Sequence, residues 1–174
     1  MTIPRVSNLG PVYFVRCELR DEHNTVLADN VYWQAATDDD LGDPKNDEQF
    51  KTNLARWSNM SALNALPKVQ VKVASEFFAQ GGQGTARITL SNDSNHVAFF
   101  LRTEITRGID GEEISPITYD DNYVTLFPHE KRVIAVGFKV SALRGQHLAL
   151  RTAGYNVEKT ASLIQGTGEP ADRR

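Results

Sequence analysis

Apolar and polar residues alternate in short segments through the second half of the chain. In the clearest segments, 86–90, 99–106 and 133–138, larger apolar residues tend to occupy every second position. A period of two places one set of side chains on a buried sheet face and the other set toward water. Clusters of Ser, Asn, Asp, Gly and Pro separate such segments at spacings of roughly ten residues, which is typical of a sandwich. The pattern therefore predicts an all-β fold, an antiparallel β-sandwich.

The turn residues refine this prediction. Asp110-Gly111 gives the tightest hairpin signal in the sequence, and the glycines at 81–84 are expected to form a turn. Pro116 cannot donate a hydrogen bond to a sheet, so 112–119 is expected to be an edge strand or to be broken by a bulge. The expected strands are 69–78, 85–90, 97–107, 112–119, 123–127, 132–138 and 146–152.

The N-terminal part is expected to form a separate hairpin. Residues 11–20 and 26–34 are its strands, and Asn24 lies in the turn, where it tolerates a positive φ. A lone two-stranded hairpin is marginal in water because it buries neither face. We therefore expect this hairpin either to dock on the sandwich or to form a dimer by pairing between chains.

An acidic segment connects the hairpin to the sandwich. Residues 35–53 have loop composition, and their spacing fits no EF-hand calcium loop, so a solvated linker is favoured over a metal site. Apolar residues at every third position of 54–66 suit one or two helical turns. The predicted fold is an immunoglobulin-like antiparallel β-sandwich with an N-terminal β-hairpin and linker. Its predicted parts are a hairpin (1–34), an acidic linker with a short helical turn (35–65), the sandwich (66–165) and a disordered tail (166–174).

Composition argues against several partner classes. The net charge is -3, with 24% charged residues, so there is no basic excess for nucleic acid. No apolar run reaches the ~18 residues of a membrane-spanning helix, and the first residues lack the apolar core of an export signal. Cys17 is the single cysteine and is expected to be a small buried hydrophobe.

Candidate chemistry is sparse. The carboxylate pair Asp120 and Asp121, flanked by Tyr119 and Tyr123, contains the candidate carbohydrate contacts. Neighbouring residues of a strand face opposite sides, so a turn with packed tyrosines is favoured over a hydrolytic pair. No catalytic, cofactor-binding or metal-ligating residue is predicted. Four histidines lack ligand spacing and are expected on the surface, and four aromatic residues near strand ends are expected to be mostly buried. These residues are His23, His96, His129 and His147, and Tyr119, Tyr123, Phe127 and Tyr155.

Two segments resemble parts of a known enzyme family. Residues 12–34, which end in Asp29-Asn30-Val31-Tyr32-Trp33, resemble the final hairpin of the penultimate immunoglobulin-like domain in family 2 glycoside hydrolases of the exo-β-glucosaminidase and β-mannosidase branch. Residues 89–133 are similar to the C-terminal sandwich of those enzymes. The motifs are Leu90-Ser91-Asn92, Ala98-Phe99-Phe100-Leu101-Arg102, Asp110-Gly111-Glu112, Pro116, Tyr119-Asp120-Asp121-Asn122-Tyr123 and Leu126-Phe127-Pro128-His129-Glu130. His129 stands where that family usually has glycine, but histidine tolerates the left-handed region, so the turn is still expected.

The resemblance implies a non-catalytic role. Enzymes of this family use two glutamates about 5 Å apart on a (β/α)8 barrel, and no residue here inherits either role. The resemblance implies a C-terminal sandwich that packs against and supports this barrel, with the other domains of the parent hydrolase as partners. The parent is expected to be secreted or periplasmic and to release β-linked glucosamine or mannose. The alternatives are an independent carbohydrate-binding module for a β-linked oligosaccharide, and a protein-interaction domain unrelated to hydrolases.

Overall fold

The computed structural model describes residues 6–166. The chain forms two compact units, Met1–Leu66 and Pro67–Arg174, so the division falls immediately before Pro67. The first unit contains a hairpin and an irregular segment, and the second contains the sandwich. Residues 167–174 of the predicted tail lie outside the described residues.

The predicted N-terminal hairpin is confirmed. Strands β1 (Val12–Arg20) and β2 (Val26–Ala35) pair antiparallel, with an irregularity between Leu19 and Arg20. Asn24 adopts the left-handed conformation with φ 64°. The turn is held by the Asp21 carboxylate, which accepts hydrogen bonds from two backbone N–H groups of the turn, at 2.9 and 2.8 Å.

The acidic segment after the hairpin is largely irregular, as its composition predicts. It contains two short 3-10 turns, η1 (Pro44–Asn46) and η2 (Ser61–Ala65). Its carboxylates accept backbone hydrogen bonds. Asp43 caps η1 at Lys45, and the Asp39 carboxylate accepts a 2.6 Å bond from the Ser58 N–H, which lowers the pKa of Asp39. The acidic residues thus order local turns.

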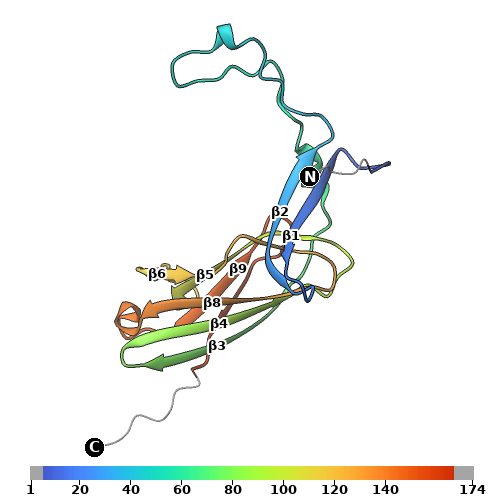
Figure 1. Cartoon of the computed structure of the whole chain (residues 1–174). Helices are drawn as coiled ribbons and strands as arrows, with labels where there is room; N and C mark the ends of the chain where they lie inside the picture. Colours follow the sequence, from blue (N-terminus) through green and yellow to red (C-terminus); the bar gives the residue numbers. More distant parts are fainter. Residues whose placement is uncertain (1–5, 167–174) are drawn as a thin grey trace, which may run out of the picture. The chain divides into compact units, whose positions relative to one another are not determined.

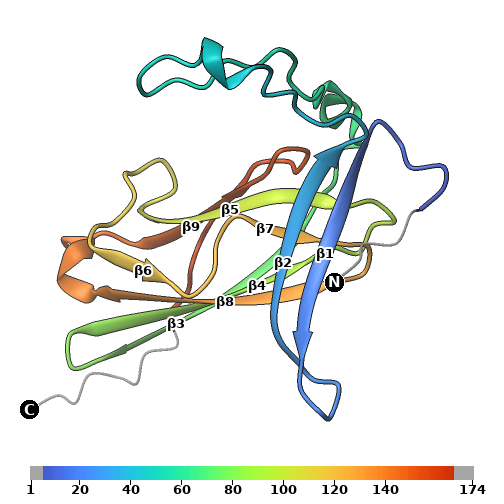
Figure 2. The ribbon, with the colours of Figure 1, turned by 45° about the horizontal axis from the view of Figure 1, so that its top comes forward.

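The second unit is a sandwich of two four-stranded sheets, as predicted. One sheet has the order β3-β4-β8-β6 and the other β10-β9-β5-β7, and all pairings between neighbouring strands are antiparallel. Figures 1 and 2 show β3, β4 and β8 side by side in one layer. The strands are β3 (Lys72–Gln80), β4 (Gln83–Ser91), β5 (Ala98–Arg107), β6 (Ile117–Tyr119), β7 (Val124–Leu126), β8 (Lys131–Lys139), β9 (Leu148–Ala153) and β10 (Thr160–Leu163). A 3-10 turn, η3 (Val140–Leu143), follows β8.

Alternation along three strands builds the core between the sheets. Every second residue of β4, β5 and β8 is buried, and most of the residues between them are exposed or half-buried, as the period of two predicts. The exceptions are Ala98 and Thr106 of β5, which are both fully buried on the register expected to face water. The inward residues are Ala86, Ile88 and Leu90 of β4, Phe99, Leu101, Thr103 and Ile105 of β5, and Ile134, Val136 and Phe138 of β8.

Two features of the sandwich differ from the predictions. β6 is an edge strand, as Pro116 indicates, but the Asp110-Gly111 segment does not close a regular hairpin. After β5 only the Thr106–Glu113 bridge forms, and the chain then crosses to the other sheet. The last strand predicted from the sequence ends at residue 152, but the structure has a further strand, β10, at Thr160–Leu163. β10 has no buried residue, and among residues 6–166 it pairs only with β9, so no alternating pattern marks it.

Three asparagines cross-link the loops of the sandwich. Asn92 and Asn156 are buried, and each makes hydrogen bonds to at least three backbone groups. Asn122 accepts a bond from the Thr103 N–H and donates one to the Thr103 carbonyl, at 2.9 and 3.0 Å. Because a side-chain amide both donates and accepts, each asparagine can satisfy backbone groups that no strand partner reaches.

Near each end of the second unit an isolated parallel bridge joins the chain to one of the two layers. Val69 forms a parallel bridge with Val157, between β9 and β10, and β3 then joins β4 in the other sheet. At the other end, Gly166 forms a parallel bridge with Phe77 of β3. Gly166 was predicted to belong to the disordered tail, yet it pairs with the edge of the sandwich.

Candidate functional site

Tyr119 links the two sheets and does not present its hydroxyl to a ligand. Its hydroxyl oxygen accepts a 3.0 Å hydrogen bond from the Ile105 N–H, and its O–H donates to Glu113 Oε1 at 3.0 Å. Burial, with the negative charge of Glu113, raises the pKa of Tyr119 above its ordinary value. The hydroxyl therefore acts as a neutral donor and acceptor inside the sandwich.

The two candidate carboxylates have separate partners. Asp120 Oδ1 accepts a 2.7 Å hydrogen bond from the Ala135 N–H, which continues the pairing of β6 with β8 beyond the end of β6. Asp121 instead forms an ion pair with Arg132 at 3.3 Å. Glycoside hydrolysis needs two carboxyl groups that converge on one sugar. Each carboxylate here holds a local backbone or side-chain partner instead.

Tyr123 belongs to an exposed aromatic pair. Its ring centroid lies 5.1 Å from that of Phe100, and the Arg102 guanidinium lies 5.9 Å from the Tyr123 centroid. Both aromatic residues are in the left-handed region, with φ values of 56° for Phe100 and 55° for Tyr123. Such a backbone is uncommon for bulky residues and occurs at sites where surrounding structure compensates for the strain.

Half of the aromatic residues near strand ends are exposed, contrary to the expectation of burial. Tyr123 is 49% exposed and Tyr155 is 45% exposed, whereas Tyr119 and Phe127 are half-buried. Tyr155 packs on the buried Phe99 ring, and Tyr123 packs on the exposed Phe100 ring. The two tyrosines therefore contact other rings while part of each side chain stays in water. Sequence reasoning missed Phe100 because it was treated as one position of an alternating strand.

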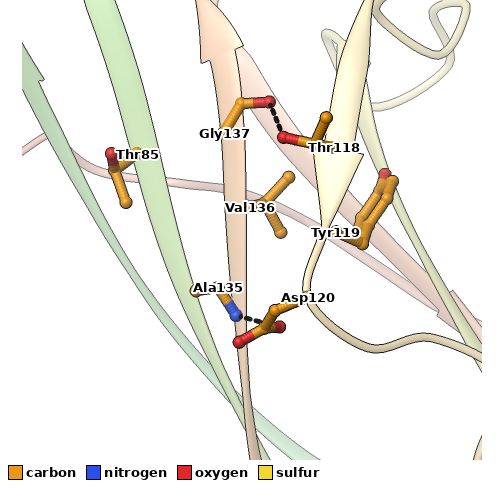
Figure 3. Close-up of a pocket in the computed structure, with 7 residues that line it drawn as sticks. All are labelled: Thr85, Thr118, Tyr119, Asp120, Ala135, Val136 and Gly137. Atoms are coloured by element: carbon orange, nitrogen blue, oxygen red, sulfur yellow. Dashed lines mark hydrogen bonds between the residues drawn. The ribbon is translucent and has the colours of Figure 1, made fainter.

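Tyr119 and Asp120 line a shallow hollow that neither Asp121 nor Tyr123 lines. The hollow measures about 350 Å³ and lies over β8, between β4 and β6 (Figure 3). Its floor includes Gly137, whose carbonyl accepts a 3.2 Å hydrogen bond from the Thr118 hydroxyl. The lining residues are Thr85, Thr118, Tyr119, Asp120, Ala135, Val136 and Gly137. A second hollow of about 300 Å³ continues along β8 toward Lys139.

The hollow offers binding groups and no complete catalytic set. Its polar side-chain groups are two threonine hydroxyls and one carboxylate, and Asp120 already accepts a backbone hydrogen bond. The Tyr119 hydroxyl points away, toward Ile105 and Glu113. Within residues 6–166, no group of three or more His, Cys, Asp or Glu side chains could hold a metal ion. All four histidines are exposed, as expected, and Cys17 is half-buried, less buried than expected. No helix among the described residues is long and apolar enough to span a membrane.

The hairpin of the first unit has one face that is apolar along most of its length. Register places Tyr13, Val15, Cys17 and Leu19 of β1 on this face, together with Tyr32 of β2. Leu19 is 62% exposed and Tyr32 is 49% exposed. The opposite face is mixed. It carries the ion pairs of Arg16 together with the apolar residues Val12, Phe14, Val31 and Trp33.

Comparison with known proteins identifies the relatives of the chain. Residues 49–157 match the family described as the exo-beta-D-glucosaminidase Ig-fold domain. An exo-beta-D-glucosaminidase of Arthroderma benhamiae is 36% identical over 148 residues, which cover 85% of this chain and 16% of the relative. One from Amycolatopsis orientalis is 27% identical over 176 residues, covering 99% of this chain and 17% of the relative.

A solved structure supports the same relationship. The crystal structure of the Amycolatopsis orientalis exo-chitosanase CsxA matches 94% of this chain with a TM-score of 0.88 and 25% identity. The matched part is 19% of that protein, so this chain spans less than a fifth of the length of its relatives. The family match covers well over half of the chain and includes the sandwich strands from β3 to β9. The chain therefore belongs to the exo-β-D-glucosaminidase Ig-fold domain family.

Proposed function

We propose that this chain is a non-catalytic part of a larger exo-β-glucosaminidase-like glycoside hydrolase, and that it packs against and supports the catalytic barrel. One observation carries the proposal: alignments that cover 85–99% of this chain occupy only 16–17% of two of its glucosaminidase relatives. The separate partners of Asp120 and Asp121 support the non-catalytic role, because neither carboxylate is placed to share a sugar with a second one.

The N-terminal hairpin supports a role within a larger protein. A two-stranded sheet cannot bury an apolar face by itself, yet Leu19 and Tyr32 lie on such a face and are largely exposed. Phe14, Val31 and Trp33 lie on the opposite face, so both faces of the hairpin carry apolar side chains. We infer that the hairpin completes the core of a preceding immunoglobulin-like domain.

The sugar released by the parent is proposed to be β-linked glucosamine. The sequence resemblance left glucosamine and mannose open. The relatives named above are glucosaminidases, and this favours glucosamine. A second function, independent binding of a β-linked oligosaccharide, has one observation in its favour, the exposed Phe100–Tyr123 ring pair. Aromatic rings of this kind can stack on pyranose faces.

The first test is the size of the native product in the source cells, detected with an antibody against this chain. We expect a band of about 100 kDa, the size of several domains joined to a barrel. A single band at 19.4 kDa would overturn the proposal. The purified chain should also leave p-nitrophenyl β-D-glucosaminide uncleaved. If the chain cleaves this substrate, and still does so after the Asp120 and Asp121 carboxylates are removed, the active site lies outside the four candidate residues.

A binding assay separates the supporting role from the carbohydrate module. The chain is heated with and without glucosamine oligosaccharides while its circular dichroism is followed, because a ligand that binds the folded state raises the melting temperature. Both tryptophans, Trp33 and Trp57, lie in the first unit, so their fluorescence would not report on the sandwich. We expect no shift. A shift that Tyr123→Ala abolishes would favour the carbohydrate module.

A further inference from the structure

The outer face of the β3-β4-β8-β6 sheet carries small side chains at its centre. Register places Thr85 of β4, Gly137 of β8 and Thr118 of β6 side by side. Ala135 lies two residues from Gly137 on the same strand and is exposed. A sheet face that remains in water usually carries charged or long polar side chains. The row of Phe78, Thr85, Gly137 and Thr118 across the four strands has none, and the face is hollowed there over β8 (Figure 3). The neighbouring row carries Glu76 and Arg87 beside Ala135.

Gly137 is the most informative residue of this face. A Cβ at Gly84, in the neighbouring strand, would lie 2.7 Å from the Phe138 ring, so internal packing explains that glycine. A Cβ at Gly137 would meet only the Thr118 hydroxyl, at 3.1 Å. Gly137 also does not have a positive φ. At 3.1 Å the exposed Thr118 side chain would have to shift slightly, so packing favours glycine at position 137 less strongly than at position 84. Glycine inside a strand weakens it, and often marks a place where another backbone or a ligand approaches closely.

Exposed apolar side chains flank the centre of the face. Phe78 lies opposite Thr85 on β3 and is 47% exposed. Val133 of β8 lies opposite Thr89 and is 42% exposed. Apolar residues at both ends of a shallow, small-residue surface are suited to contact with another protein surface.

We propose that this outer face is the docking surface for another domain of the same polypeptide. The inference rests on the proposed function, because it takes the docking domain to be part of the larger hydrolase. The relatives provide the occupant: the matched segment is only 16–19% of their length, so more than four-fifths of such a polypeptide is available to cover the face. Contacts between domains of one chain typically bury roughly 600–1,500 Å², the scale of one sheet face.

The polar groups of the hollow favour a protein over a sugar as the occupant. The Thr118 hydroxyl donates to the Gly137 carbonyl, and Asp120 accepts from the Ala135 N–H. The Tyr119 hydroxyl is bonded on its other side to Ile105 and Glu113. Sugar recognition relies on polar groups that are available to hydroxyls and on an exposed ring. The Phe100–Tyr123 ring pair lies elsewhere, on β5 of the other sheet and immediately before β7.

The test compares cysteine labelling in this chain and in the full-length product. Ala135→Cys reports on the proposed surface, and Ala161→Cys, on exposed β10, is the matched control. Ala86→Cys, at a fully buried position, confirms that the sandwich is folded in both forms. All three are made in a Cys17→Ser background, and the labelling rate by a maleimide at each position is measured by peptide mass spectrometry.

We expect labelling of Ala135→Cys to be about tenfold or more slower in the full-length product, because docking buries the thiol, while Ala161→Cys changes less than about twofold. Equal rates at position 135 in the two forms would overturn the inference and leave the proposed function intact. If the source cells contain only the 19.4 kDa product, the proposed function itself fails. Protection of Ala135→Cys in the short chain by a glucosamine oligosaccharide would replace the protein partner with a sugar.

Discussion

Replacement of the buried Asn156 by alanine should destabilise the sandwich by about 3 kcal/mol. Asn156 Oδ1 accepts a hydrogen bond from the buried Phe99 N–H at 2.8 Å, and its amide donates to the Pro67 and Val97 carbonyls at 2.7 and 2.8 Å. Stranding a buried N–H costs roughly 1–3 kcal/mol, and each partly buried carbonyl loses a bond of roughly 0.5–1.5 kcal/mol. Because water can reach the exposed Pro67, we take values from the lower half of these ranges.

The measurement is urea unfolding of the whole chain, followed by far-ultraviolet circular dichroism because both tryptophans lie outside the sandwich. In a thermal scan the same loss should lower the melting temperature by roughly 15 °C. Asn156→Asp keeps the acceptor for Phe99 but points an oxygen at two carbonyls, so it should destabilise at least as much as Asn156→Ala. Asn95→Ala is the control, because Asn95 is exposed and its one described bond is to His129.

A small effect would refute this reasoning. If Asn156→Ala loses less than about 1 kcal/mol while the slope of free energy against urea is unchanged, the three bonds do not hold the loops as described. Asn156→Asp as stable as the original chain would show that the two donated bonds contribute nothing. The control should change by no more than about 0.5 kcal/mol.

Three further predictions concern the sandwich. Gly84→Ala should cost about 1–3 kcal/mol in urea unfolding, because its Cβ would lie 2.7 Å from the Phe138 ring, and an unchanged midpoint would contradict this. The raised pKa of Tyr119 means that the folded chain holds this proton more tightly than the unfolded chain, so stability should fall as pH rises above the ordinary value of 10.0, and Tyr119→Phe should flatten that decline. The hydrogen bond and charge of Lys72 lower the pKa of Asp93 in the folded chain. This pair should therefore contribute stability above pH 3.8, which is lost as the pH falls through the lower pKa of the folded state. Asp93→Asn should remove a small, salt-sensitive part of the dependence of stability on acid pH.

The alternation of apolar and polar residues predicted the strands that have one buried and one exposed face. Ile88, Leu101 and Ile134 are fully buried, and the positions beside them are exposed or half-buried, because each strand lies between the core and water. The same reasoning failed for β10 (Thr160–Leu163), which is exposed throughout and is held by its pairing with β9. A strand that buries nothing has no pattern of buried positions for the sequence to show.

The candidate site was harder to predict because it depends on distant segments. Adjacent strand residues were expected to face opposite sides, and Asp120 and Asp121 indeed have different partners. The hollow, however, forms over three neighbouring strands, β4, β8 and β6. It is deepened at Gly137, which has no side chain. In the contact between Phe100 and Tyr123, both residues have a left-handed backbone conformation. Aromatic residues have no intrinsic preference for this conformation, so the sequence does not indicate it.

The entry of the chain into the sandwich has a mechanical consequence. Val69 donates a hydrogen bond to the Asn156 carbonyl at 2.9 Å and accepts one from the Glu158 N–H at 3.0 Å, only three residues before β3 joins the opposite sheet. The chain is therefore hydrogen-bonded to the connection between β9 and β10 before it enters the sheet that contains β3. We therefore expect force along the incoming chain to break the two Val69 bonds before β3 separates from β4.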